Sequence, residues 1–276
     1  MKIALLEIAL MLVIVAPACS PTYPKEKLGQ SIRELFKKEV GTEDVLHKVA
    51  GRTLYVSFPI ENMVSPTLDL PKDVLEKIED AMISIARIGM STDESLDFII
   101  LNARDNTWGV ETTLVRRIED LKFLYYMKIS KTDFDERFIL ETKNFDLEKD
   151  PPERDWNGMT LQEYMARWVA FRIGLGSQSN PFLNVLMGIH KVSFAYDSAK
   201  LALTLQVDGS NSGLQEQFLK AAVFEQMKKA ETKYLSRLPK GESWAQTLRV
   251  EDNKGGLIFS ADRGEWIKDE TKNTDR

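Results

Sequence analysis

The sequence predicts an α+β fold of two similar helix–hairpin–helix–strand subdomains, each an antiparallel sheet with helices packed on one face. Two observations support this prediction. Apolar residues recur every three or four positions in some segments and alternate in others, as in amphipathic helices and half-buried strands. The same order of elements also appears in both halves of the chain. Hydrophobic residues make up 43% of the 276 residues, which is enough to bury a core.

The N-terminal half contains six predicted elements. Pro24 suits the first turn of a helix, and Gly41 ends that helix. Leu54, Val56 and Phe58 share one face of a strand. The elements in order are a helix at 24–41, strands at 45–49 and 52–60, a helix after Pro71, a buried strand at 98–101 and a short partner strand at 110–114.

The C-terminal half repeats this order. Thr160 and Glu163 form a capping box at the start of a helix. The elements in order are a helix from 160, a break at 174–181, strands at 192–196 and 201–207, a long helix at 212–237 and strands at 248–250 and 257–259. The order is common in α+β proteins, so duplication and chance are both open explanations of the repeat.

Two segments separate the halves. The first, at 115–142, is predicted to be helical. The second, at 146–158, contains two consecutive prolines and five acidic residues. This composition is typical of a boundary between domains, and we interpret the second segment as a polar linker.

The N-terminus has a different character from the rest of the chain. Ile8–Ala18 is an uncharged run of eleven residues, too short to span a bilayer and of the length of a signal-peptide core. Glu7 departs from that pattern, because a carboxylate beside the run weakens membrane insertion. The alternative interpretation is a buried N-terminal helix or strand of a cytosolic protein.

The apolar run ends at Ala16-Pro17-Ala18-Cys19, which holds the only cysteine of the chain. This stretch resembles the lipobox of bacterial lipoproteins, with a small residue directly before the cysteine and with Ala16 where Leu is usual. The resemblance implies a diacylglyceryl group on the Cys19 thiol and a further acyl chain on its amine after cleavage. Two or more acyl chains anchor a protein durably, whereas one binds only marginally.

The residues from Cys19 to Lys27 are also similar to the mature start of a group of uncharacterised bacterial lipoproteins. The resemblance implies an extracytoplasmic location in the cell envelope, and Ser20 implies the outer membrane where the organism has one. The predicted organisation is a signal peptide at 1–18, a lipidated tether at 19–23, an N-terminal α+β subdomain at 24–145, a linker at 146–158, a C-terminal α+β subdomain at 159–262 and a polar tail at 263–276.

Candidate catalytic and ligand-binding residues are few. His47 and His190 lie outside the spacings of known metal motifs, and His47 alternates with apolar residues as a structural strand residue does. The segment at 208–213 resembles a calcium loop faintly and is better interpreted as a turn with Ser212 as the helix N-cap. We predict no catalytic, cofactor-binding or metal-binding residues; Cys19 is the one site residue, as the lipid attachment point.

Other side chains keep an enzymatic alternative open. Carboxylates are plentiful and a glycosidase needs only two, although solvated helix faces explain them better. They include Glu111, Glu119, Asp120, Asp133, Asp135 and Glu136. A set of tryptophans suits a sugar-binding site or, more simply, the core: Trp156, Trp168, Trp244 and Trp266.

The sequence therefore favours an envelope lipoprotein with a non-catalytic binding or assembly role and no cofactor. Its partners would be the membrane, through lipid at Cys19, and either another envelope protein or further copies of the chain. The repeated layout is similar to that of small ring-building modules in secretion-system lipoproteins. A net charge of −5 gives no basic excess, which argues against nucleic acid. The alternatives are a lipid-anchored, carboxylate-dependent hydrolase of cell-wall material and an unprocessed cytosolic protein.

Overall fold

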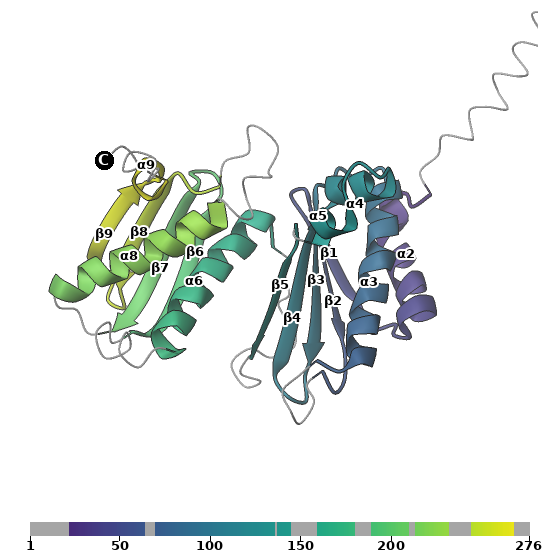
Figure 1. Cartoon of the computed structure of the whole chain (residues 1–276), viewed down its shortest axis with the longest axis horizontal. Coiled ribbons are helices and arrows are strands. Elements are labelled where there is room, and N and C mark those ends of the chain that lie inside the picture. Colours follow the sequence, from purple (N-terminus) through teal and green to yellow (C-terminus); the bar gives the residue numbers. More distant parts are fainter. Residues whose placement is uncertain are drawn as a thin grey trace, which may run out of the picture. The chain divides into compact units, whose positions relative to one another are not determined.

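A computed structural model describes residues 22–63, 70–135, 137–144, 159–179, 189–209, 213–231 and 244–267. The predicted signal peptide, the tether up to residue 21 and the linker at 146–158 lie outside these residues. The chain divides into two compact units, Met1–Gly158 and Met159–Arg276. Both are mixed α+β structures with mostly antiparallel sheets, which confirms the predicted fold class (Figure 1).

Unit 1 is built on a five-stranded sheet in the order β1-β2-β3-β4-β5. β2 and β3 are parallel because the helix α3 crosses between them, and the other neighbouring pairs are antiparallel. The elements are η2 Lys25–Lys27, α2 Leu28–Leu35, the π-helical turn η3 Phe36–Val40, β1 Leu46–Ala50, β2 Thr53–Pro59, α3 Lys72–Ser91, β3 Phe98–Asp105, β4 Val110–Arg117, α4 Ile118–Tyr125, α5 Lys131–Asp135 and β5 Ile139–Asn144.

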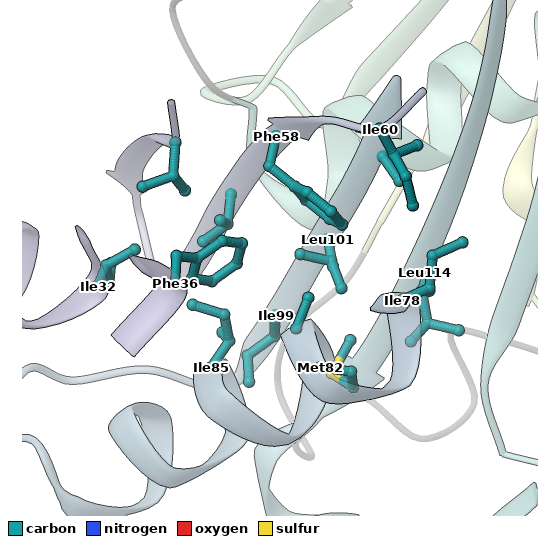
Figure 2. Close-up of a cluster of buried hydrophobic side chains, with 14 of the residues drawn as sticks. Ile32, Phe36, Phe58, Ile60, Ile78, Met82, Ile85, Ile99, Leu101 and Leu114 are labelled. Atoms are coloured by element: carbon teal, nitrogen blue, oxygen red, sulfur yellow. The ribbon is translucent and has the colours of Figure 1, made fainter. Parts of the chain in front are cut away.

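The core of unit 1 lies between one face of this sheet and the helices α2 and α3 (Figures 1 and 2). Leu54, Val56 and Phe58 alternate onto that face from β2, as predicted, and all three are buried. The ring of Phe36, from η3, meets Phe58 edge-on with 5.4 Å between ring centroids. Gly41 ends the helical segment with a φ of +81°, a left-handed conformation that favours glycine.

Unit 2 has a four-stranded sheet in the order β6-β7-β8-β9, again with one parallel pair, β7 and β8. The helices α6 and α8 cover one face of it (Figure 1). The elements are α6 Leu161–Ser179, β6 Ile189–Asp197, β7 Ala202–Gly209, α8 Gly213–Lys229, β8 Thr247–Asp252, β9 Leu257–Asp262 and α9 Arg263–Trp266. The predicted capping box is present: the amide of Glu163 donates to Thr160 Oγ1 at 3.2 Å, and that of Thr160 to Glu163 Oε2 at 2.7 Å.

Three sequence predictions are wrong in detail. The stretch 115–142 is not one helix, because it holds the end of β4, the short helices α4 and α5 and the start of β5. The break predicted from residue 174 begins later, since α6 continues to Ser179. The polar tail predicted from residue 263 begins with the helix α9, in which Trp266 is buried.

The repeat between the halves extends to individual backbone hydrogen bonds. In unit 1 the carbonyl of Arg52, just before β2, accepts from the amides of Asp97 and Phe98 at the start of β3, at 2.8 and 3.2 Å. The carbonyl of Asp97 then accepts from Ile118, the first residue of the helix after β4, at 2.8 Å.

Unit 2 has the same connections at the corresponding places. The carbonyl of Leu201, just before β7, accepts from Gln246 and Thr247 at the start of β8, at 2.7 and 3.5 Å. The carbonyl of Gln246 accepts from Arg263, the first residue of the helix after β9, at 2.9 Å. The repeat predicted from the sequence is thus a repeat of strand order and of backbone hydrogen bonds, with β5 of unit 1 as the one described strand that has no counterpart in unit 2.

Candidate functional site

The candidate site lies at one end of unit 1, where α3 ends and α4 carries the chain out of the sheet. α4 begins at Ile118, directly after β4, and two carboxylates occupy its first turn, where the helix dipole favours negative charge. One of them, Asp120, is buried and accepts from Arg137 Nη1 at 3.1 Å. This ion pair holds the start of α4 against the segment that leads into β5.

Arg116 fixes the helix α5, which follows α4. Its Nη1 donates to the carbonyl of Phe134 at 2.7 Å, and its guanidinium lies 3.8 Å from the centroid of the Phe134 ring and 4.4 Å from that of Phe138. Burial lowers the pKa of Arg116 to about 10, against the opposing effect of Asp135 and Asp120, so the side chain remains charged at neutral pH. The segment between α4 and α5 is therefore supported at both of its ends.

Three consecutive large side chains, Tyr125 at the end of α4 and Tyr126 and Met127 directly after it, are exposed, and we call them the aromatic tip. Their exposed fractions are 74%, 66% and 91%. Met127 has a φ of +55°, a left-handed conformation that is uncommon outside glycine, at the place where the chain turns away from α4. The two tyrosine rings meet edge-on at 5.3 Å. Contiguous exposed apolar side chains of this kind are typical of surfaces that contact a partner or a membrane.

A shallow cleft of about 340 Å³ adjoins the tip. Its lining comes from the C-terminal end of α3 and from α4: Arg87, Met90, Ser91, Lys122, Tyr125 and Tyr126. The cleft thus combines aromatic surface with two cationic side chains. Arg87 is paired with Glu39 at 2.6 Å.

The start of the described chain is attached beside this cleft. Tyr23 forms a parallel bridge with Thr92, and its amide donates to the carbonyl of Ser91, a cleft residue, at 3.4 Å. The amide of Lys25 donates to Asp93 Oδ1 at 2.8 Å. The N-terminal segment therefore enters unit 1 at the same end as the aromatic tip.

A polar cluster separate from the cleft lies on the sheet face opposite the core of unit 1. Ser57 Oγ donates to Asn102 Oδ1 at 3.2 Å, and Asn102 Nδ2 donates to Thr113 Oγ1 at 2.9 Å. All three residues are buried. The row satisfies its own hydrogen bonds, which is what buried polar groups need for stability.

The carboxylates that the sequence singled out have partners in the structure. Glu111 is buried and lies 2.9 Å from Lys143 Nζ. The others that the structure describes pair as follows: Glu119 with Arg117, Asp120 with Arg137, Asp133 with Ser130, and Asp135 with Arg116. Glu136 lies outside the described residues. Each described carboxylate thus contacts a cation or a hydroxyl group.

His47 packs against the backbone of Gly29 across the β1–α2 contact. Burial, and secondarily the charge of Arg33, lowers the pKa of His47. His190 lies in β6. Among the described residues no group of three or more His, Cys, Asp or Glu side chains is placed to hold a metal ion, and within the same ranges no helix is long and apolar enough to cross a bilayer.

The tryptophans do not line a common surface. Trp168, Trp244 and Trp266 are buried in unit 2, and Trp244 Nε1 donates to the carbonyl of Gln162 at 3.3 Å. Trp156 lies outside the described residues, as do Cys19 and residues 210–212 of the calcium-like segment. For the three described tryptophans the simpler interpretation, a place in the core, is confirmed.

Sequence reasoning missed the aromatic tip, although a signal was present. Phe123-Leu124-Tyr125-Tyr126-Met127 is a run of five large apolar residues inside the stretch predicted to be helical. Consecutive positions in a helix point around its whole circumference, so such a run cannot face a single core. The run therefore indicates either a helix buried on all sides or an exposed apolar surface.

No protein-family model matches the chain, and neither the curated proteins nor the solved structures contain a significant match to it.

Proposed function

We propose that this chain is a lipid-anchored lipoprotein of the bacterial cell envelope with a non-catalytic role in binding or assembly at the membrane surface. One observation carries the proposal: the only cysteine ends an uncharged run of signal-peptide length, where the sequence turns from apolar to polar. Near the start of the described residues, the amide of Tyr23 donates to the carbonyl of Ser91 in unit 1. A lipid on Cys19 would thus hold unit 1 close to the bilayer.

The position of the cysteine supports this interpretation. A structural thiol is usually buried in a core, whereas Cys19 precedes every described core residue, the first of which is Leu28. A lone cysteine cannot form a disulfide within the chain. A lipid-bearing role accounts for a cysteine at this place.

Intact-mass analysis of the chain from a bacterial membrane fraction tests the proposal. We expect a mature protein that begins at Cys19 and carries the mass of a diacylglyceryl group and a further acyl chain. The Cys19→Ser variant should keep Met1 and carry no lipid. Thr22→Ser, a conservative change three residues away, is the matched control and should be processed normally. A wild-type chain that keeps Met1, or a soluble chain with a free thiol, would contradict the proposal.

A further inference from the structure

The aromatic tip has the composition of a membrane-interface contact. Tyrosine is enriched at the headgroup level of bilayers, because its ring is apolar and its hydroxyl polar. Lys122 and Lys128 flank the tip and are exposed. From Leu121 to Thr132 the chain has three lysines and no carboxylate, although its net charge is −5. The tip and its flanking lysines therefore combine aromatic and cationic side chains, within a stretch bounded by carboxylates at Asp120 and Asp133.

The attachment of the N-terminal segment selects a bilayer as the occupant of this surface. Tyr23 is bonded to Ser91, and Ser91 lines the cleft together with Tyr125 and Tyr126. Tyr23 lies four positions after Cys19, so an acyl group on Cys19 starts within about 14 Å of Tyr23. Figure 1 shows α4 at the same end of unit 1 as the start of α2. The anchor thus brings this end of the protein, rather than the opposite one, to the lipid surface.

We propose that the aromatic tip is a second membrane contact: Tyr125, Tyr126 and Met127 enter the headgroup region, while Lys122 and Lys128 bind the phosphates of anionic lipids. The inference rests on the proposed function, because the acyl chains of Cys19 deliver the tip to the bilayer. Amphipathic segments of this type bury their apolar side about 5–10 Å into the interface. The side chains of the tip are already exposed, so they could reach this depth without a change in fold.

A single labelled cysteine on the lipidated full chain tests the proposal. Met127 is 91% exposed, so Met127→Cys does not disturb the core. Lys72→Cys is the matched control: its side chain is 90% exposed at the other end of the 20-residue helix α3, about 30 Å from Ser91. Both variants are purified from membranes, labelled with a polarity-sensitive thiol fluorophore and reconstituted in vesicles of phosphatidylethanolamine and phosphatidylglycerol.

We expect the label at position 127 to be quenched by spin-labelled lipid and protected from an aqueous quencher, with the reverse at position 72. The double variant Lys122→Glu/Lys128→Glu, made in the Met127→Cys background, should lose several-fold of the lipid-borne quenching. A label at position 127 that is as accessible to the aqueous quencher as the label at 72 would overturn the proposal. Protection at 127 from the aqueous quencher without quenching by spin-labelled lipid would also overturn it, because something other than lipid would then cover the label.

Failure of the tip and failure of the lipid anchor give different results. Wild-type chain that takes up the thiol reagent has a free Cys19, which contradicts the proposed function. If the wild-type chain takes up no label, Cys19 is blocked and the lipid anchor stands. A water-exposed label at position 127 would then contradict only the membrane contact of the tip.

Discussion

Gly29 and His47 are in such close contact that the imidazole Cε1 of His47 lies 2.5 Å from the position that a Cβ on Gly29 would occupy. Contacts this short do not occur between real Cβ atoms and other heavy atoms, so any larger residue at position 29 must displace the ring. The pair joins α2 to the edge strand β1.

Gly29→Ala should lower the free energy of unfolding by about 1 kcal/mol or more, because the added methyl group overpacks this contact. In a His47→Ala background the same substitution should raise it by about 0.5–1 kcal/mol, since alanine is the better helix former. Urea denaturation of the four proteins measures this double-mutant cycle. An equal effect of Gly29→Ala in both backgrounds would show that the contact is not what constrains position 29.

His47 should make the stability of the protein depend on pH. Burial and the charge of Arg33 lower the pKa of His47 in the folded state, so the unfolded chain binds the proton more readily. The stabilising contribution is complete above the unfolded pKa of about 6.5 and is lost as pH falls through the lower folded value. The free energy of unfolding of wild type, minus that of His47→Gln, should therefore decrease on acidification.

An NMR titration of the His47 ring provides the direct measurement. We expect its midpoint below that of an unfolded peptide, and we expect Arg33→Gln to move it upward, because one of the two causes is removed. A midpoint above the peptide value would refute this account of the site.

Arg116→Met should lower the free energy of unfolding by about 2–4 kcal/mol. The substitution removes one of the two donors to the carbonyl of Phe134, the other being the amide of Arg137, and leaves Asp120 with less positive charge nearby. Both groups are largely shielded from water, so the loss is costly. Lys131→Met, at the exposed start of α5, is the control and should change stability by less than about 0.5 kcal/mol. Chemical denaturation measures both variants, and equal losses would contradict a stabilising role for Arg116.

Asp105 and Asp252 each end the first strand of the second hairpin in their unit, and each bonds the amides of the turn that follows. Asp105 is fully buried and accepts from Thr107 and Trp108 and also from Met63, at 2.8–3.1 Å. Asp252 accepts from the amides of Lys254 and Gly256 at 2.8 and 2.7 Å.

The Asp105→Ala variant should therefore lose about 2–3 kcal/mol of stability and Asp252→Ala about 1 kcal/mol, because only the former leaves a buried amide unpaired. Hydrogen exchange of the turn amides reports each change locally. Asp105→Asn keeps one acceptor oxygen and should lose less than Asp105→Ala. A larger loss at Asp252 would contradict the assignment of burial as the deciding factor.

The long elements could be predicted from the sequence because their apolar residues follow one period. In α3, Val74, Ile78, Met82 and Ile85 recur at helical spacing and all are buried against the sheet. The hairpins were equally clear, since their strands alternate and their turns contain glycine or aspartate. These local signals agree with the tertiary structure and therefore suffice.

β5 and the continuation of α6 could not be predicted in this way. β5 pairs with β4 through the backbone, and its Leu140 is 48% exposed. Its apolar residues therefore do not show the alternation that would distinguish a strand from the helical sequence before it. In α6 the glycine at position 174 disfavours a helix by about 1 kcal/mol, but burial of the preceding Trp168, Val169 and Ile173 outweighs that local cost.

The aromatic tip shows a different limit. Its residues have the composition of a core, and only the structure reveals that Tyr125, Tyr126 and Met127 are directed outward. The path of the chain at the tip is fixed on either side by two contacts, Arg116 with the carbonyl of Phe134 and Asp120 with Arg137. The partners in each contact lie far apart in the sequence. No periodicity in the sequence contains that information.

The attachment of the N-terminal segment also has a mechanical consequence. The segment is tied at and just after the end of α3 by two hydrogen bonds, from the amide of Tyr23 to the carbonyl of Ser91 and from the amide of Lys25 to the carboxylate of Asp93. Leu28 is the first residue of the buried core cluster. Each such hydrogen bond contributes about 1 kcal/mol. A force on Cys19 would therefore detach the residues before Leu28 from unit 1 before it acted on the sheet. The extended chain between Cys19 and the first attached residue would lengthen from about 14 Å to about 30 Å. A lipid-anchored protein could then move away from the bilayer without unfolding.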